Sequence, residues 1–164
     1  PCISMPGNAN MYDYGNLFWP DADRTLVIAF RPKVVTAGWL INTGPGNAIR
    51  LNAGNLEVGG RPTDADATYS WSTGIPVTIN ECHYCIATWS RGEGVSLRLD
   101  NVEPAVTDPN ILGFNNYITV YIGGDGGSRF NGDIAELILF KRLLKRNELE
   151  LLHTYLTAKY GIPA

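Results

Sequence analysis

The chain has 164 residues, of which 45% are hydrophobic and 18% charged, and its formal net charge at pH 7 is -3. This length fits one domain, and the acidic balance excludes the basic surface expected of a nucleic-acid-binding protein. No apolar run approaches the roughly 20 residues needed to cross a bilayer, so membrane insertion is not expected. The 18 glycines and 10 prolines fall between short apolar runs, which favours β structure.

Short apolar runs separated by turn residues predict a series of antiparallel strands. The first run, Arg24 to Arg31, is rich in β-formers and stops at Pro32, which cannot donate to a strand ladder. From Val95 to Asp100 apolar and polar residues alternate, which predicts one buried and one wet face. The other predicted strands are Gly38 to Asn42, Ala48 to Asn52, Asn55 to Val58, His83 to Trp89, Tyr117 to Ile122 and Ile134 to Phe140.

The last two predicted strands are separated by a glycine-rich segment, and the second of them is apolar on both faces. Between them lies the glycine-rich segment Gly123 to Ser128, which we expect to be a hairpin loop. The run Ile134 to Phe140 has apolar side chains at odd and even positions, as in a central strand covered by a second layer.

One segment near the C-terminus departs from the β pattern and predicts a short helix. We expect Asn147 to cap its start, Glu150 to complete a capping box and Gly161 to end it. The helix should cover an edge or an open end of the sandwich through three leucines at helical spacing, Leu149, Leu152 and Leu156.

The order of these elements and three motifs resemble the laminin-G-like branch of the concanavalin A-like lectin/glucanase superfamily. In the second motif Asn101 stands where the family usually has glycine. The motifs are the opening strand Thr25 to Phe30, the hairpin of His83 to Trp89 with Val95 to Asp100, and the closing block from Phe130 to Ile162.

The resemblance implies an all-β fold, an antiparallel jelly-roll β-sandwich with one short C-terminal helix, in agreement with the strand spacing. We assign residues 24–164 to this laminin-G-like domain and residues 1–23 to an N-terminal arm.

Catalysis is not expected. Some relatives with this fold are glycanases that carry Glu-x-Asp-x-x-Glu along one strand, and that motif is absent here. Asp133 and Glu136 are three apart on a predicted strand, so they should point to opposite faces and fail as an acid and base pair. His83 and His153 adjoin no activated Ser or Cys motif, which indicates structural histidines.

Metal binding has two candidate motifs. Cys82 and Cys85 are spaced like half a zinc site, but no second Cys/His pair completes it, so we expect small hydrophobic side chains packed on opposite strand faces. We predict no cofactor, with calcium as the alternative, because laminin-G-like relatives often hold calcium with rim carboxylates. Asp100, at the matching hairpin position, and Asp125, in the glycine-rich loop, are the candidate ligands.

Sugar binding would require an aromatic surface with polar side chains on loops at one rim. Trp39, Asn47, Tyr69 and Trp71 lie near predicted turns and are the candidate ligand-binding residues. The competing interpretation is burial, because Trp and Tyr also fill sandwich cores and interfaces.

Two functions remain open for such a non-catalytic module. The first is assembly: a bacteriophage virion surface component, such as a capsid decoration, fibre or tail protein, that forms homo-oligomers and contacts other subunits. The lack of a visible signal peptide or second domain favours it, as does an N-terminal arm that a partner surface would hold. The alternative is a secreted or cell-surface glycan-binding adhesion module, with or without calcium.

Overall fold

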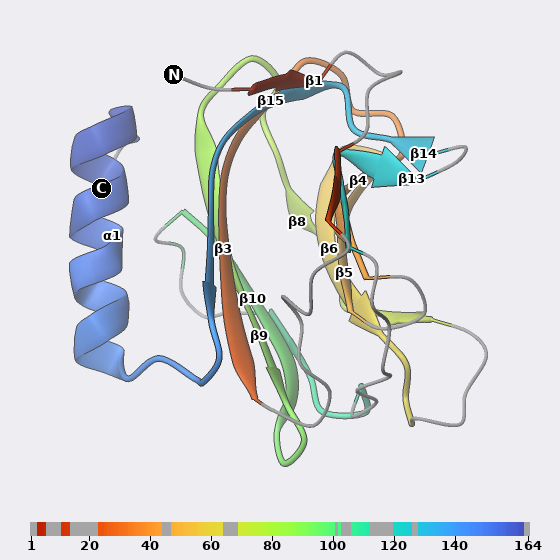
Figure 1. Cartoon of the computed structure of the whole chain (residues 1–164), viewed down its shortest axis with the longest axis vertical. Helices are drawn as coiled ribbons and strands as arrows, with labels where there is room; N and C mark the ends of the chain where they lie inside the picture. Colours follow the sequence, from red (N-terminus) through yellow and green to blue (C-terminus); the bar gives the residue numbers. More distant parts are fainter. Residues whose placement is uncertain are drawn as a thin grey trace.

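The computed structural model describes residues 3–5, 11–13, 23–43, 47–63, 69–100, 102, 106–111, 120–125 and 128–162. These residues form two stacked β-sheets and one helix outside the first sheet, so the predicted jelly-roll sandwich with a short C-terminal helix is confirmed (Figure 1). The elements are β1 (Ile3–Met5), β2 (Met11–Asp13), β3 (Arg24–Pro32), β4 (Gly38–Asn42), β5 (Ala48–Asn52), β6 (Asn55–Gly60), β7 (Ser70–Trp71), β8 (Ile75–Pro76), β9 (His83–Ser90), β10 (Gly94–Leu99), β11 (Val106–Asp108), β12 (Val120–Ile122), β13 (Gly124–Asp125), β14 (Ser128–Arg129), β15 (Gly132–Phe140) and α1 (Arg146–Tyr160).

The first sheet has the described strand order β1-β15-β3-β9-β10-β11, and every described pair in it is antiparallel. The second sheet has the order β13-β14-β4-β5-β6-β7, with β12 joining β4 and β2, and β8 joining β6. Its β14–β4 pair is parallel. The sheets therefore form the two layers that the strand pattern predicts.

The core between the sheets follows from the two-residue period of the strands. On β3, Leu26, Ile28 and Phe30 point toward the second sheet, while Val27 and Ala29 point outward. The largest core side chain is Trp89, 1% exposed, whose indole N–H donates to the carbonyl of Gly59 at 3.2 Å. That bond links β9 of the first sheet to β6 of the second.

Helix α1 covers the outer face of the first sheet and not an edge or an open end (Figure 1). The prediction of its position was therefore wrong. The reason is that β3, β9 and β15 carry apolar side chains on both faces, so the outer face also needs burial. The second cluster joins Leu156 and Ile162 to the outward residues Val27, Ala29, Tyr84 and Ile86, with Leu149 and Leu152 packed beside them.

The two ends of α1 were predicted with unequal success. Gly161 ends the helix in the left-handed conformation at φ 66°, as expected. The start lies two residues earlier than predicted, with Lys145 and not Asn147 at the N-cap. The carboxylate of Glu148, and not that of Glu150, accepts the Lys145 backbone N–H, at 2.8 Å.

A β-bulge in β15 overturns the expectation that Asp133 and Glu136 face opposite ways. Asp133 pairs with Arg31 and Glu136 pairs with Ala29, because the register shifts between Ile134 and Glu136. One extra residue cancels the alternation, so both carboxylates lie on the outer, helix-covered face.

The glycine-rich segment is not a hairpin loop between neighbouring strands, because β12 belongs to the second sheet and β15 to the first. The segment contains a small hairpin of its own, β13 with β14. Glycine at 123 and 124 permits positive φ values of 80° and 141°, which the chain uses to turn from one sheet toward the other.

Two strands of the predicted N-terminal arm pair with strands of the sandwich. β1 pairs with β15 in the first sheet, and β2 pairs with β12 in the second. This part of the arm is thus attached within the chain, which removes one reason for expecting a partner there.

Candidate functional site: an aromatic platform on the second sheet

Three of the predicted ligand-binding residues come together on the outer face of the second sheet. Trp39, Tyr69 and Trp71, called the aromatic platform below, are each partly exposed. The rings of Tyr69 and Trp71 stack at 18°, with centroids 5.3 Å apart, and Trp39 lies 5.4 Å from Trp71 and 6.0 Å from Tyr69. The platform thus joins residues from β4 and from the segment around β7.

Strand register places the platform. Trp39 pairs with Arg50, and Arg50 pairs with Glu57, so the three side chains form a row on one face across β4, β5 and β6. Trp71 pairs with Gly59. A Cβ at Gly59 would lie 2.5 Å from Trp71 Cε3, so the indole occupies space that only glycine leaves open.

A polar cluster surrounds the rings. The Arg50 guanidinium lies over Trp71, 3.7 Å from the ring centroid, and its Nε donates to Glu57 Oε2 at 2.7 Å. Asn52 Nδ2 donates to the other carboxylate oxygen of Glu57 at 3.1 Å. The Arg50 guanidinium therefore covers one face of the Trp71 ring, and fixed hydrogen-bonding groups lie directly against the aromatic platform.

The Tyr69 hydroxyl is held in place from β4, since it donates to Asn42 Oδ1 at 3.0 Å. Asn42 itself is buried. This bond orients the Tyr69 ring on the sheet, so the aromatic platform is built on strands and not on a loop alone.

Asn47, the fourth candidate, does not reach the aromatic platform. Its side chain is buried, at 2% exposure, and its backbone N–H donates to Thr43 Oγ1 at 2.7 Å. The Thr43 hydroxyl in turn donates to the Asn47 carbonyl at 3.0 Å. Asn47 therefore shapes the turn between β4 and β5.

Of the two calcium candidates, Asp100 is the one whose side chain the structure describes. Asp100 Oδ2 accepts a hydrogen bond from His83 Nδ1 at 2.8 Å, and Oδ1 accepts the Tyr84 backbone N–H at 2.9 Å. The Asp125 side chain lies outside what the structure describes, and no group of three or more metal-ligating side chains occurs among the described residues.

Both histidines have structural partners. His83 is buried, and both ring nitrogens lie beside oxygen acceptors: Nε2 is 3.0 Å from the Thr78 carbonyl oxygen and Nδ1 is 2.8 Å from Asp100 Oδ2. Burial alone would lower the pKa of His83, but these hydrogen bonds and the Asp100 charge outweigh it and raise the pKa. His153 shares a hydrogen bond with the Tyr84 hydroxyl beneath the helix.

The two central cysteines differ in a way that the sequence did not reveal. Cys85 packs in the core as expected, and burial raises the pKa of its thiol. Cys82 precedes β9 and is exposed, so its predicted packing as a hydrophobic side chain was wrong.

The carboxylates of Asp133 and Glu136 form ion pairs with basic side chains. Asp133 accepts hydrogen bonds from Arg31 and Lys33, at 2.5 and 2.9 Å, and Glu136 accepts one from Lys159 at 3.1 Å. Both carboxylates therefore fix the fold, even though the bulge places them on one face.

Sequence reasoning missed the polar residues around the aromatic platform. Arg50, Asn52 and Glu57 lie on strands that the sequence predicts correctly. The face that Arg50 and Glu57 share follows from the hairpin of β5 and β6. Trp39 joins that face because the register shifts by one residue between Trp39 and Ile41, which period-two alternation does not predict. The contribution of Gly59 depends on contact with β7, which the sequence pattern did not reveal.

Comparison with known proteins shows likeness in structure only. No protein-family model and no curated protein matches the sequence. The native heptameric SAP-like pentraxin from Limulus polyphemus superposes with a TM-score of 0.69 at 17% identity, covering 93% of this chain and 81% of the pentraxin. The receptor-binding domain of botulinum neurotoxin D gives 0.74 at 10% identity, covering 98% of this chain and 46% of that one.

A third similar structure is that of botulinum neurotoxin type C, whose ability to enter cells is dependent upon interaction with two ganglioside molecules. It gives a TM-score of 0.62 at 12% identity, and 83% of this chain covers 36% of the toxin chain. At such identities the likeness establishes the jelly-roll fold alone. This chain spans less than half the length of the two toxin chains.

The described residues include no helix long and apolar enough to span a membrane.

Proposed function

We propose that this chain is a non-catalytic saccharide-binding module whose binding surface is the aromatic platform. The observation that carries the proposal is the gathering of Trp39, Tyr69 and Trp71, partly exposed, on one sheet face. Partly exposed aromatic rings grouped around fixed polar groups are typical of recognition surfaces.

The chemistry of the platform suits a pyranose ring. The C–H face of a sugar is apolar and stacks on an indole, while its hydroxyls need donors and acceptors at the edge of the ring. Arg50, Asn52 and Glu57 offer both kinds of group and already hold one another in place. A preorganised surface loses little side-chain entropy on binding.

The similar structures support a binding role without specifying the ligand. The neurotoxin D structure is a receptor-binding domain, and the type C toxin interacts with gangliosides, which are glycolipids. A secreted or cell-surface location follows from this proposal, because saccharides are displayed there.

Assembly is the second candidate, because the similar pentraxin is heptameric. A homo-oligomer of this chain on a virion surface would combine assembly with glycan binding. Sedimentation of the purified chain tests the oligomer: a symmetric species is expected on this view, and a strictly monomeric chain that binds no virion shell would exclude it.

A glycan array followed by calorimetric titration tests the main proposal. We expect a saccharide that binds wild type, and we expect Trp39→Ala and Trp71→Ala each to lose about tenfold or more in affinity, since each removes an aromatic ring from the platform. Adding EDTA to the same titration tests the calcium alternative.

The matched control is Tyr155→Ala, which removes an exposed aromatic side chain from α1 on the opposite side of the sandwich. It should leave saccharide affinity unchanged. A blank array, or equal loss in Tyr155→Ala and Trp39→Ala, would contradict the proposal.

A further inference from the structure

A second candidate site lies at the end of the sandwich where β9 begins, and it does not rest on the proposed saccharide function. The structure has a hollow of about 430 Å³ there, within the usual range for ligand pockets. Its walls come from β8, from the segment that joins β8 to β9, from the end of β10 and from the residue that follows the helix-ending glycine. It is called the β8–β10 hollow below.

Most of the lining of this hollow is apolar. Leu99 and Ile162 are 4% and 3% exposed, Ile75 is partly exposed and Val102 is 59% exposed. Apolar side chains therefore extend along the hollow from the core to the surface. A ligand with an apolar body can remove its own surface from water against them.

Two of the polar lining residues already have partners. His83 Nδ1 lies 2.8 Å from Asp100 Oδ2, and His83 Nε2 lies 3.0 Å from the Thr78 carbonyl oxygen. The second carboxylate oxygen of Asp100 accepts the Tyr84 backbone N–H at 2.9 Å. These contacts fix the polar end of the hollow.

Glu81 differs from this pair. Its side chain is exposed, and it makes no hydrogen bond or ion pair with the part of the chain that the structure describes. No lysine or arginine occurs among the described residues that line the hollow. The carboxylates of Glu81 and Asp100 thus outnumber the single basic group, His83, so the hollow is acidic whether or not His83 is protonated.

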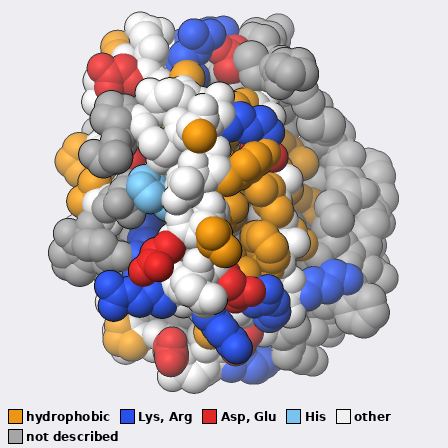
Figure 2. Space-filling model, turned by 90° about the vertical axis from the view of Figure 1, so that its left-hand side faces the viewer, with side chains coloured by type: hydrophobic (Ala, Val, Ile, Leu, Met, Phe, Trp, Pro, Cys, Tyr) orange, Lys and Arg blue, Asp and Glu red, His pale blue; other side chains and the backbone are white. Residues whose placement is uncertain are grey.

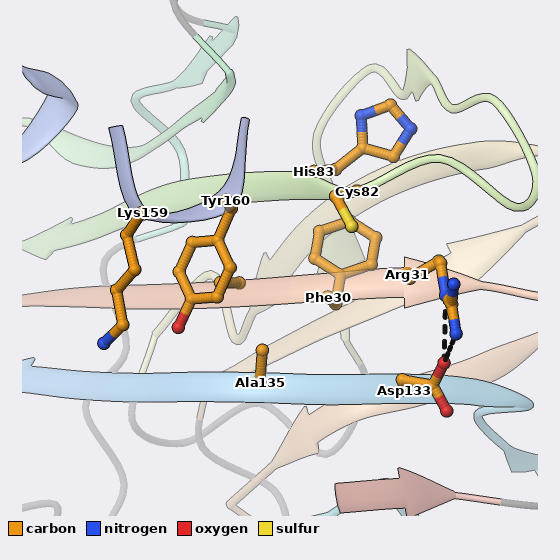
Figure 3. A pocket seen from close by; sticks show the side chains of 9 residues that line it. Phe30, Arg31, Cys82, His83, Asp133, Ala135, Lys159 and Tyr160 are labelled. Carbon is orange, nitrogen blue, oxygen red and sulfur yellow. Dashed lines mark hydrogen bonds and ion pairs between the residues drawn. The ribbon is translucent and has the colours of Figure 1, made fainter. Parts of the chain in front are cut away.

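A neighbouring hollow under the C-terminal end of α1 provides a contrast. Cys82 and His83 line both hollows, and Figure 3 shows them on one side of the neighbouring one, with the Arg31–Asp133 pair and Lys159 toward its two ends. Figure 2 shows charges of both signs among hydrophobic side chains on this α1 side of the molecule. A cation would meet basic side chains in the neighbouring hollow, whereas the described lining of the β8–β10 hollow presents carboxylates without lysine or arginine.

We propose that the β8–β10 hollow binds a small amphipathic cation, with its ammonium group at Glu81 and its apolar body against Leu99 and Ile162. The apolar body gains from burial, and the ammonium group gains a charge-assisted hydrogen bond to the Glu81 carboxylate. A neutral molecule of the same shape lacks the second contribution, and an anion is repelled.

Calorimetric titration with octylammonium at neutral pH, with octanol and octanoate as the neutral and anionic comparisons, tests the proposal. Wild type should bind octylammonium about three- to fivefold more tightly than octanol, the range expected for an exposed ion pair, and octanoate more weakly still. Added salt should weaken octylammonium binding and leave octanol binding unchanged. Bound octylammonium should also slow alkylation of the exposed Cys82 thiol, followed by peptide mass spectrometry.

Two variants separate the polar and apolar contributions. Glu81→Gln should lower octylammonium affinity to that of octanol, a loss of about three- to fivefold, and leave octanol affinity unchanged. Ile75→Ala shortens an apolar wall and should weaken both ligands by a similar factor. The matched control is Glu93→Gln, the same change at an exposed position in the turn between β9 and β10, at the other end of β9 from Glu81. It should bind octylammonium like wild type.

The proposal is overturned if wild type binds no octylammonium, or if octanol or octanoate binds equally well. It is also overturned if Glu81→Gln, folded by circular dichroism, keeps wild-type affinity, or if Glu93→Gln loses as much as Glu81→Gln. Saccharide binding to the aromatic platform should be unchanged in all of these variants, so the two proposals can fail separately.

Discussion

The two outer faces of this sandwich are used differently. On the first sheet, α1 covers apolar side chains such as Val27 and Ile86, and Leu156 is fully buried against them. On the second sheet, the aromatic platform and the Arg50–Glu57 pair remain partly exposed. The helix-covered face is buried and serves stability, whereas the aromatic face is partly exposed and carries the proposed binding surface.

The difference originates in the strands. β3 and β9 carry apolar residues on both faces, and such strands need two covering layers. β5 alternates Ile49 and Leu51 inward with Arg50 and Asn52 outward, which is the pattern of a strand with one solvated face. Sequence alternation therefore distinguishes the stabilising sheet from the exposed one.

The largest expected effect comes from removing the helix anchor. Leu156→Ala should lower the free energy of unfolding by about 2 to 5 kcal/mol, since it leaves a cavity under α1. It should not change saccharide affinity. Urea denaturation measures the loss, and Leu151→Ala on the same helix is the matched control.

Leu151 is 70% exposed, so its truncation should change the free energy of unfolding by no more than about 0.5 kcal/mol. If Trp39→Ala destabilised the chain more than Leu156→Ala, the assignment of stability to the helix-covered face would be wrong.

A smaller effect on the free energy of unfolding is expected from the hydrogen bond between His83 and Asp100. Because the folded pKa of His83 is raised above its ordinary value of 6.5, the bond's contribution is complete below that pH. It is lost as pH rises through the folded pKa. Unfolding free energies measured from about pH 5 to 9 should therefore contain a falling component that His83→Gln abolishes.

His153→Gln keeps the His83–Asp100 bond and should keep that component. A pH profile that His83→Gln leaves unchanged would show that the bond does not link stability to pH.

The smallest expected effect is the loss of saccharide affinity on substitution of Gly59, which lies beneath the aromatic platform. In Gly59→Ala the new Cβ would lie 2.5 Å from Trp71 Cε3, so the indole must shift. We expect a loss of about three- to tenfold in saccharide affinity, less than in Trp71→Ala. Gly92→Ala is the control, because a Cβ at Gly92 meets nothing within 4 Å.

Affinity that survives Gly59→Ala unchanged, with the Trp71 fluorescence also unchanged, would mean that the exact position of this ring is irrelevant to binding.

Much of the fold was predictable from local pattern. β4 and β5 begin and end where the apolar runs predict, and Gly161 ends the helix as its lack of a Cβ suggests. The bulge at Ile134 was not predictable, because a register shift depends on the partner strand β3 and not on the sequence of β15.

The candidate site was predictable only in part. The sequence predicted Trp39, Tyr69 and Trp71 as ligand-binding residues, and the structure brings these three rings together, whereas Asn47 is a buried residue of the turn that precedes β5. The role of the three rings in ligand binding stays a prediction. Sequence spacing could not show that Trp71 lies over Gly59, because β6 and β7 pair across residues 61–69. The position of Trp71 over Gly59 depends on a tertiary contact and not on local propensity.

The most direct test of the central claim is an NMR titration of the tryptophan indole N–H signals with the saccharide selected on the array. The account predicts the largest shifts at Trp39 and Trp71, and little change at Trp89, whose indole is buried and bonded to Gly59 between the sheets. Saturable binding that leaves the Trp39 and Trp71 signals unmoved, or that shifts residues of α1 instead, would contradict it.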